Sequence, residues 1–321
     1  MTRPILTAAL LSLPMAAAAQ DPALGWPVEC TLGEDCFLQN YVDADPGPGA
    51  ADFTCGPQSY EGHQGTDIAL RSNAAMDAGV EVRAAAAGIV LGLRDGEPDS
   101  AQGRPGVPDV AGRECGNGVL IDHGNGWQTQ YCHMASGSLV VREGQQVAAG
   151  DPLGRIGLSG NTEFPHLHLT VRRDGVVVDP FAPLAEGACG EAGEPLWLDP
   201  VGYDPGGLVS AGVATAVPDF VAVKDGTARD VPGRGEPLVL WAQVHGGRTG
   251  DVLVLRVAGP DGEGLVDHSE LLERDQARLF RAAGLRAPEG GWAPGRYEGT
   301  ATLTRDGTEL ERRPIAFEIA P

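Results

Sequence analysis

Two histidines, His166 and His168, stand one residue apart in the run HLHLTV of residues 166–171. Because side chains alternate between the two faces of a β-strand, His166, His168 and Thr170 share one face, and the apolar residues between them share the other. The apolar face can pack in a hydrophobic core, but packing does not explain the two imidazoles on the opposite face. The pair therefore indicates either a site with imidazole chemistry or two half-exposed surface histidines.

A second candidate pair, His63 and Asp67, lies in the run GHQGTD of residues 62–67. A neutral imidazole and a carboxylate are suitable zinc ligands, and Gly65 between them allows a tight backbone that aims both at one point. A catalytic zinc site typically has three protein ligands and leaves one position for water. His63, Asp67 and one histidine of the HLH pair would supply those three ligands.

A fifth candidate, His133, closes the run WQTQYCHM of residues 127–134. With GVLIDHG before it, this run predicts a hairpin turning at HGNG, with Trp127, Thr129, Tyr131 and His133 on one face of the return strand. Strict alternation then places Cys132 on the opposite face, which favours a packing or disulfide role for it.

Short β-patterned runs punctuated by Gly, Asn, Asp and Pro dominate both halves of the chain, without a long amphipathic helix. Strands are expected at 79–84, 88–93, 118–124, 127–134, 138–144, 153–160, 166–180, 219–226, 237–246, 251–268, 295–307 and 312–320. Residues 269–285 fit either a helix or an edge strand with a loop. A fold that is mostly β and antiparallel follows, with a second, sandwich-like part downstream.

Four segments in order, GHQGTD, GNGVLIDHGNGWQTQYCHM, VREGQQVAAGDPLGRIGLSGNT and PHLHLTV, resemble the M23 family of zinc metallopeptidases, the lysostaphin or LytM type. The resemblance covers about residues 60–180. It implies one Zn²⁺ per chain held by His63, Asp67 and His168, with His133 and His166 acting on the bound water and the reacting carbonyl. The chain departs from the family pattern at Cys132, at Phe164 and at Leu169-Thr170, none of which is a ligand or catalytic position.

The resemblance also implies the function: a zinc endopeptidase that hydrolyses peptide cross-links of peptidoglycan in the cell envelope, with peptidoglycan stem peptides as its partners. Two alternatives stay open. One is a non-catalytic activator of cell-wall amidases, although such relatives typically lack ligands and this chain keeps all five functional positions. The other is a secreted protease of Gly-rich proteins.

The first residues, MTRPILTAALLSLPMAAAAQ, predict a secretory signal peptide over 1–19, because Arg3 precedes an apolar run and Ala17–Ala19 form a small-residue cleavage signal. The apolar run is shorter than the ~20 residues of a bilayer span. We therefore expect an exported protein, periplasmic or secreted, without a transmembrane segment after signal removal. The formal net charge of −21 argues against nucleic acid as a partner.

The cysteines are even in number, and in an exported chain this indicates disulfides. They are Cys30, Cys36, Cys55, Cys115, Cys132 and Cys189. Cys30 and Cys36 are near enough in sequence to form a local bridge. A structural zinc knuckle is the alternative, but the chain has no CxxC pair to support it.

Cysteines end at Cys189, and the Gly-, Pro- and acid-rich run that follows predicts a boundary near residues 200–210. The expected organisation is a signal peptide at 1–19, a cysteine-containing segment at 20–59 packed on the catalytic domain, an M23-type peptidase domain at 60–200 and a smaller Ig-like β-sandwich at 210–321. We expect the last part to offer a binding site for an envelope protein. His123 is interpreted as a turn residue, and His245 and His268 as surface residues.

Overall fold

The computed structural model describes residues 21–101, 107, 109–183, 189–190 and 193–321. The predicted signal peptide lies outside these residues. The described chain is mostly β, with antiparallel pairing between its named strands, as the sequence predicts. Within the described ranges, no helix has the length and apolar character needed to cross a bilayer.

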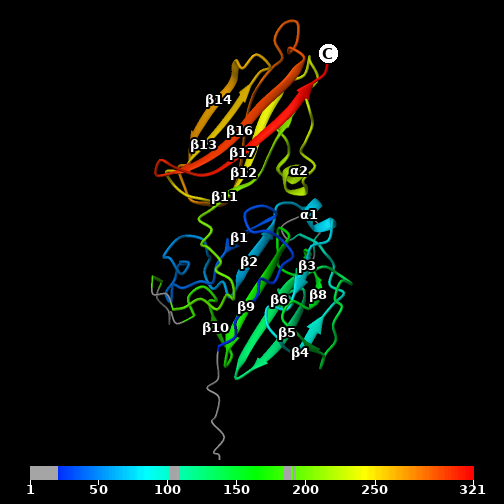
Figure 1. The fold of residues 1–321 in the computed structure, drawn as a ribbon, viewed down its shortest axis with the longest axis vertical. Coiled ribbons are helices and arrows are strands. Elements are labelled where there is room, and N and C mark those ends of the chain that lie inside the picture. The colour runs from blue at the N-terminus through cyan, green and yellow to red at the C-terminus, as the bar shows by residue number, and fades with distance from the viewer. Residues whose placement is uncertain (1–20, 102–106, 108, 184–188, 191–192) are drawn as a thin grey trace, which may run out of the picture.

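A large antiparallel sheet carries the residues singled out above, and its strands run in the order β1-β2-β9-β6-β5-β4-β7, with β10 paired to β9 (Figure 1). Its strands are β1 (Cys36–Asn40), β2 (Thr66–Leu70), β4 (Gly88–Arg94), β5 (Asn117–Gly124), β6 (Trp127–Met134), β7 (Gln146–Val147), β9 (His166–Arg173) and β10 (Val176–Val178). A separate pair, β3 (Glu81–Arg83) and β8 (Pro152–Arg155), and the short helix α1 (Asn73–Asp77) accompany it.

The core of this sheet follows the predicted alternation. Leu167, Leu169 and Val171 of β9 are buried in one cluster with Ile121 of β5 and Tyr131 of β6. The segment before residue 60 belongs to the same body, because β1 forms an edge strand and its residues enter this core. Because these apolar side chains pack in the core, His166 and His168 project from the opposite face of β9.

The C-terminal unit, defined here as residues 207–321, consists of two sheets around one core. The three-stranded sheet contains β11 (Gly207–Ala214), β12 (Leu238–Gly247) and β15 (Gln276–Leu285). The four-stranded sheet contains β13 (Val252–Ala258), β14 (Gly264–Leu271), β16 (Gly295–Arg305) and β17 (Thr308–Ile319). Buried residues from both sheets, such as Leu240 and Leu255, form one cluster, which is the packing of a sandwich.

Two strand predictions are wrong. Residues 219–226 contain the helix α2 (Phe220–Asp225), because Asp219 caps its N-terminus through Val221 N and Gly226 ends it in the left-handed region at φ 79°. Residues 138–144 form a loop, in which a turn bonds Arg142 to Gln145. The ambiguous run 269–285 resolves into the end of β14 and β15.

The C-terminal unit packs directly on the large sheet, with α1 and α2 side by side at the junction (Figure 1). Asn73 Nδ2 donates to Asp225 Oδ1 at 2.6 Å across it. Phe37, Ala69 and Val209 form a small buried cluster that combines both bodies.

The surface assignment of His245 is wrong, because this histidine lies in the junction. Its exposed fraction is 3%, and its ring centroid lies 4.2 Å from that of Phe37. The burial of β12 beneath the junction, which sequence periodicity does not reveal, is the reason. His268 is partly exposed, with 44% of its side chain accessible.

All six cysteines are paired, as the sequence predicts, in the bridges Cys30–Cys36, Cys55–Cys189 and Cys115–Cys132. The first is the expected local bridge. The second joins the segment before residue 60 to the chain beyond β10, and the third lies beside the histidines. The zinc-knuckle alternative is thereby excluded.

Candidate metal centre

Antiparallel pairing of β2 with β9 brings two of the predicted residues together. Asp67 of β2 lies directly opposite His168 of β9, and Ala69 lies opposite His166. Residues directly opposite on neighbouring strands point to the same face, so the carboxylate and the imidazole meet. His63, in the loop before β2, completes the cluster from the end of the sheet.

The predicted ligands converge through one atom each. His63 Nε2 lies 3.2 Å from Asp67 Oδ1 and 3.2 Å from His168 Nδ1, and the last two atoms lie 2.8 Å apart. His63 and Asp67 are buried, whereas 16% of the His168 side chain is exposed. The cluster therefore sits at the base of a surface opening rather than in a sealed core.

The remaining polar atom of each group is held by another residue. His63 Nδ1 donates to Tyr41 O at 2.7 Å, because a carbonyl oxygen only accepts. Asp67 Oδ2 accepts from Asn40 Nδ2 at 2.8 Å. His168 Nε2 lies 3.1 Å from the Thr170 hydroxyl. Such outer hydrogen bonds orient imidazole and carboxylate ligands toward a metal.

This donor set fits a zinc ion. With Nδ1 of His63 protonated, its neutral ring offers a lone pair at Nε2, directed at a carboxylate oxygen that also only accepts. A proton or a cation must lie among these atoms to satisfy them. Two imidazole nitrogens and one carboxylate oxygen form a common three-ligand set for catalytic zinc.

Opposing charges balance burial within the cluster. Burial acts to lower the pKa of His63, but the charge and hydrogen bond of Asp67 outweigh it and raise that pKa. Burial acts to raise the pKa of Asp67, but the neighbouring histidines, His63 first, hold it well below its usual range. Burial lowers the pKa of His168, which favours the neutral ring that a metal requires.

His133 reaches the cluster by a route that strict alternation does not predict. Asn117 pairs with Met134 and Val119 pairs with Tyr131, so the single residue Gly118 of β5 faces both Cys132 and His133 of β6. This is a β-bulge, and His133 has a left-handed φ of 62° within it.

The predicted face assignment for this end of β6 is therefore wrong. Tyr131 lies in the core, whereas Cys132 lies opposite His168 and lines the site together with His133. The extra residue of the bulge restores Met134 to the core. The predicted bonding role of Cys132 in a disulfide is nonetheless confirmed.

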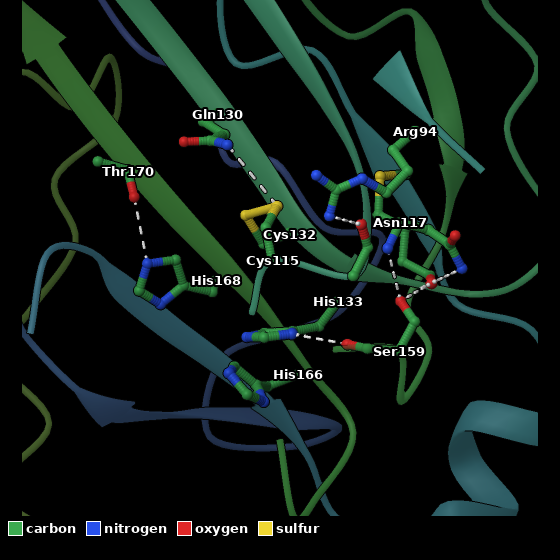
Figure 2. Close-up of a disulfide and its surroundings, with 12 residues drawn as sticks. Arg94, Cys115, Asn117, Gln130, Cys132, His133, Ser159, His166, His168 and Thr170 are labelled. Atoms are coloured by element: carbon green, nitrogen blue, oxygen red, sulfur yellow. Dashed lines mark hydrogen bonds between the residues drawn. A yellow bond between two sulfur atoms is a disulfide. The ribbon is translucent and has the colours of Figure 1, made fainter. Parts of the chain in front are cut away.

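The imidazoles of His133, His166 and His168 gather on one side of the Cys115–Cys132 disulfide (Figure 2). The rings of His133 and His166 have centroids 4.6 Å apart, and those of His133 and His168 lie 5.9 Å apart. Burial, with the charges of the two neighbouring histidines, holds the pKa of His133 well below its usual range.

A groove of about 350 Å³ opens over the cluster, lined by Tyr60, Gln64, Glu114, Cys115, Gln130, Cys132, His133, Asn161, His168, Thr170 and Arg172. Thr170 and Arg172 extend the His166 and His168 face along β9, and Arg172 donates to Gln130 Oε1 at 2.8 Å. The groove brings protein donors and acceptors alongside the candidate ligands.

Several residues of the site were not foreseen. Arg172 continues the period-2 spacing of His166 and His168, so that spacing could have revealed it. Asn40 supports Asp67 from β1, and the ring of Tyr60 lies 4.4 Å from that of His63. No local pattern connects these two with the cluster. His123 lies outside it and bonds Ala87 O and the Thr129 hydroxyl.

Gly65 fulfils the predicted need for a close backbone. A Cβ at this position would lie 2.6 Å from His168 Nε2 and 2.8 Å from Leu169 O. Such contacts are shorter than side chains tolerate, so the residue between His63 and Asp67 must lack a side chain for β9 to approach.

Curated relatives match part of the chain. It is 36% identical over 106 residues to the cell division protein DipM of Caulobacter vibrioides, covering 33% of this chain and 16% of DipM. It is 48% identical over 56 residues to the peptidoglycan DD-endopeptidase ShyA of Vibrio cholerae, covering 16% and 12%. It is 34% identical over 95 residues to the murein hydrolase activator EnvC of Escherichia coli, covering 29% and 22%. The chain thus spans less than a quarter of each of these relatives.

Among solved structures, the crystal structure of a zinc-containing peptidase from Vibrio cholerae aligns with 50% of this chain and 39% of its own, at 22% identity and a TM-score of 0.34. The sequence profile of peptidase family M23 matches residues 61–180. That range contains His63, Asp67, His133, His166 and His168. Residues 61–180 of the chain therefore form a domain of peptidase family M23.

Proposed function

We propose that the protein is a zinc-dependent endopeptidase that hydrolyses peptide cross-links of peptidoglycan in the cell envelope. In this proposal His63, Asp67 and His168 hold one zinc ion per chain, and His133 and His166 act on water and substrate. The observation that carries it is the convergence of His63 Nε2, Asp67 Oδ1 and His168 Nδ1 within 3.2 Å at the base of a groove.

Zinc bound by three such ligands supplies Lewis-acid polarisation of a carbonyl and a bound water whose pKa falls toward ~7. The protein contributes the geometry. Tyr41, Asn40 and Thr170 fix the orientations of the three ligand side chains through the hydrogen bonds described above. In this proposal, a peptide bond of an extended substrate lies in the groove beside the exposed edge of His168.

His133 fits the role of general base. Its Nδ1 donates to Ser159 O at 2.8 Å, so the neutral ring keeps a free lone pair on Nε2. Its depressed pKa favours that neutral form. A ring fixed in this tautomer can take a proton at Nε2 without first rotating.

His166 fits the role of proton donor and oxyanion partner. Its Nδ1 lies 3.0 Å from Phe164 O, and its Nε2 lies 3.3 Å from Asp67 Oδ1, so both nitrogens face groups that accept. A ring with hydrogen on Nε2 directs that hydrogen toward the cluster of candidate ligands. It can therefore donate to a carbonyl oxygen that gains negative charge during the reaction.

The substrate class is proposed from the relatives and from the disulfides of the chain. ShyA, which shares 48% identity over its matched 56 residues, is a peptidoglycan DD-endopeptidase. Three disulfides are typical of proteins that fold outside the cytoplasm, where peptidoglycan is found. We propose that the protein is exported to the periplasm or beyond, after removal of residues 1–19, and that the C-terminal unit is available to an envelope partner.

The main competing function is activation of a cell-wall amidase without catalysis, since EnvC, a murein hydrolase activator, also matches. An activator has no need of zinc ligands or of further imidazoles beside them. This chain retains all five groups and arranges them around one point, which favours the enzyme.

Digestion of purified peptidoglycan tests the proposal. The protein loaded with zinc should release new amino termini from stem-peptide cross-links, identified by mass spectrometry, and His168→Ala should not. Intact peptidoglycan combined with stimulated amidase activity would establish the activator instead. Cleavage of a Gly-rich protein but not of peptidoglycan would establish a secreted protease.

A further inference from the structure

An arginine of the C-terminal unit reaches the side of the large sheet that carries the catalytic candidates. The guanidinium carbon of Arg278, in β15, lies 3.9 Å from the ring centroid of Phe164 and 5.3 Å from that of Phe37. Its Nε donates to Gln39 Oε1 at 2.8 Å, and Gln39 Nε2 donates back to Ala277 O at 3.1 Å. One hydrogen bond and two ring contacts thus hold the guanidinium across the junction, and the bond to Ala277 O holds its partner Gln39 in place.

Phe164 in turn contacts His166. Their rings are stacked, with centroids 4.6 Å apart and planes inclined by 29°. Phe164 O accepts from His166 Nδ1 at 3.0 Å and from the Thr162 hydroxyl at 2.7 Å. The ring and the carbonyl of Phe164 therefore both contact the His166 imidazole and set its position.

Stability alone gives a poor account of Arg278. Its Nη2 is buried and has no hydrogen-bond partner among the described residues. Burial lowers the pKa of Arg278 to about 9, against the opposing charges of Asp67 and Glu163. A buried cation without a full set of partners costs free energy that an apolar side chain of similar size would not. An apolar side chain at this position could not, however, provide a planar cation above the Phe164 ring.

We propose that Arg278 is a positioning residue, which holds the Phe164 ring and through it sets the orientation of the His166 imidazole against Asp67. This inference rests on the proposed function insofar as it concerns turnover. It makes the C-terminal unit a structural part of the proposed catalytic site, because Arg278 belongs to β15.

The test compares Arg278→Met with Arg281→Met in the full-length protein. Arg281 lies on the same strand but bonds Glu270 within the C-terminal unit, so it is a matched control. Arg278→Met should keep its zinc and a KM within about twofold of the wild type, while kcat falls roughly 10-fold, because small errors in placing a reacting group reduce rates strongly. Arg278→Lys, a cation without the planar fork, should recover only part of the loss.

A second measurement does not depend on activity. In metal-free protein labelled at histidine, the ring signals of His166 in nuclear magnetic resonance spectra should shift in Arg278→Met and stay in place in Arg281→Met. Phe164→Leu, which removes the stacked ring from the other side, should produce a similar shift and a similar loss in kcat. This variant also covers the case in which Arg278→Met fails to fold.

Unchanged kcat and unmoved His166 signals in folded Arg278→Met would overturn the inference. So would a joint loss of zinc and melting temperature, since that result assigns Arg278 a purely structural role. Absence of hydrolysis by the wild type would contradict the proposed function instead, and the histidine signals would still decide the positioning role.

Discussion

At the scale of single residues, the two histidines of HLH differ although they share one face of β9. His168 Nδ1 lies 2.8 Å from Asp67 Oδ1 and 3.2 Å from His63 Nε2, whereas His166 Nε2 lies 3.3 Å from Asp67 Oδ1. The first histidine along the strand is held by Phe164 and Thr162, and the second by Thr170. This difference predicts different consequences of substitution.

His168→Ala should lose zinc and activity together, because two remaining ligands hold the ion weakly. His166→Ala and His133→Ala should retain about one zinc per chain while their rates fall roughly 10²–10⁴-fold, the usual scale for a lost acid–base or oxyanion group. Elemental analysis and turnover measurements test the two expectations, with His268→Ala, a partly exposed histidine of the C-terminal unit, as the control. Loss of zinc by His166→Ala with retention by His168→Ala would reverse the assignment within HLH.

Gly65→Ala should weaken zinc binding without unfolding the protein. The new Cβ would lie 2.6 Å from His168 Nε2, so the His168 ring must move away from Asp67 and His63. We expect a roughly 10–100-fold loss in zinc affinity, comparable to losses from disturbed ligand orientation. Competition against a chelator measures this, with Gly202→Ala as the control because nothing lies within 4 Å of its Cβ. Equal affinities in the two variants would show that the site tolerates the displacement.

At the scale of elements, a β-bulge and a disulfide together determine the conformation of the end of β6. The β-bulge at Cys132 and His133 turns both side chains toward the site, and the Cys115–Cys132 bridge ties the bulge to the loop before β5. The backbone N–H of His133 also donates to Cys115 O at 2.8 Å. The position of His133 therefore depends on a covalent constraint one residue away.

Replacing Cys115 and Cys132 together by serine should reduce both stability and turnover. Opening a bridge between residues 17 apart costs about 3 kcal/mol in the chain-entropy account. Turnover should fall as well, because the bulge that aims His133 loses its tie, while zinc content should stay. Urea unfolding and kinetics measure the two effects. The matched control, Cys30→Ser with Cys36→Ser, should lose stability but keep turnover, and an equal loss of turnover in both variants would contradict the local role of the bridge.

At the scale of the whole molecule, the junction between the large sheet and the C-terminal unit buries ionisable groups. His245 is enclosed there beside Phe37, and its Nδ1 is buried without a partner among the described residues. Burial comes first, and the charges of four arginines, Arg278, Arg71, Arg305 and Arg313, add to it in holding the pKa of His245 well below its usual range. The Asp204 carboxylate oxygen nearest to the ring is 3.7 Å away.

This environment predicts a pH-dependent stability. The unfolded chain takes up a proton on His245 near pH ~6.5, whereas the depressed pKa of the folded state delays it. The contribution of His245 is thus fully present above pH ~6.5 and is lost as the pH falls below that value, at up to ~1.4 kcal/mol per pH unit. Urea unfolding of wild type and His245→Gln between pH 5 and 8 should show a shallower decline for the variant. Parallel curves would exclude this role.

The residue types and spacings of the sequence alone were sufficient for the mostly antiparallel fold, for disulfides rather than free cysteines, and for the family of residues 61–180. They did not give the bridges Cys55–Cys189 and Cys115–Cys132. The predicted properties depend on residues close together in the sequence. The period-2 alternation shows which face of β9 is apolar, and the HxxxD and HxH patterns supply the imidazole and carboxylate donors of the site. The helix caps Asp219 and Gly226 are also visible in the sequence, but the apolar alternation between them led to the prediction of a strand instead of α2.

Only the tertiary structure decided how distant segments meet. The bulge that turns His133 depends on the register of β5 against β6, and register is a property of the pair rather than of either strand. Asn40 reaches Asp67 because β1 joins the sheet edge, and Arg278 reaches Phe164 because β15 crosses the junction. His245 is buried for the same reason. Contacts between residues of different elements leave no periodic trace in the sequence, so packing alone determines them.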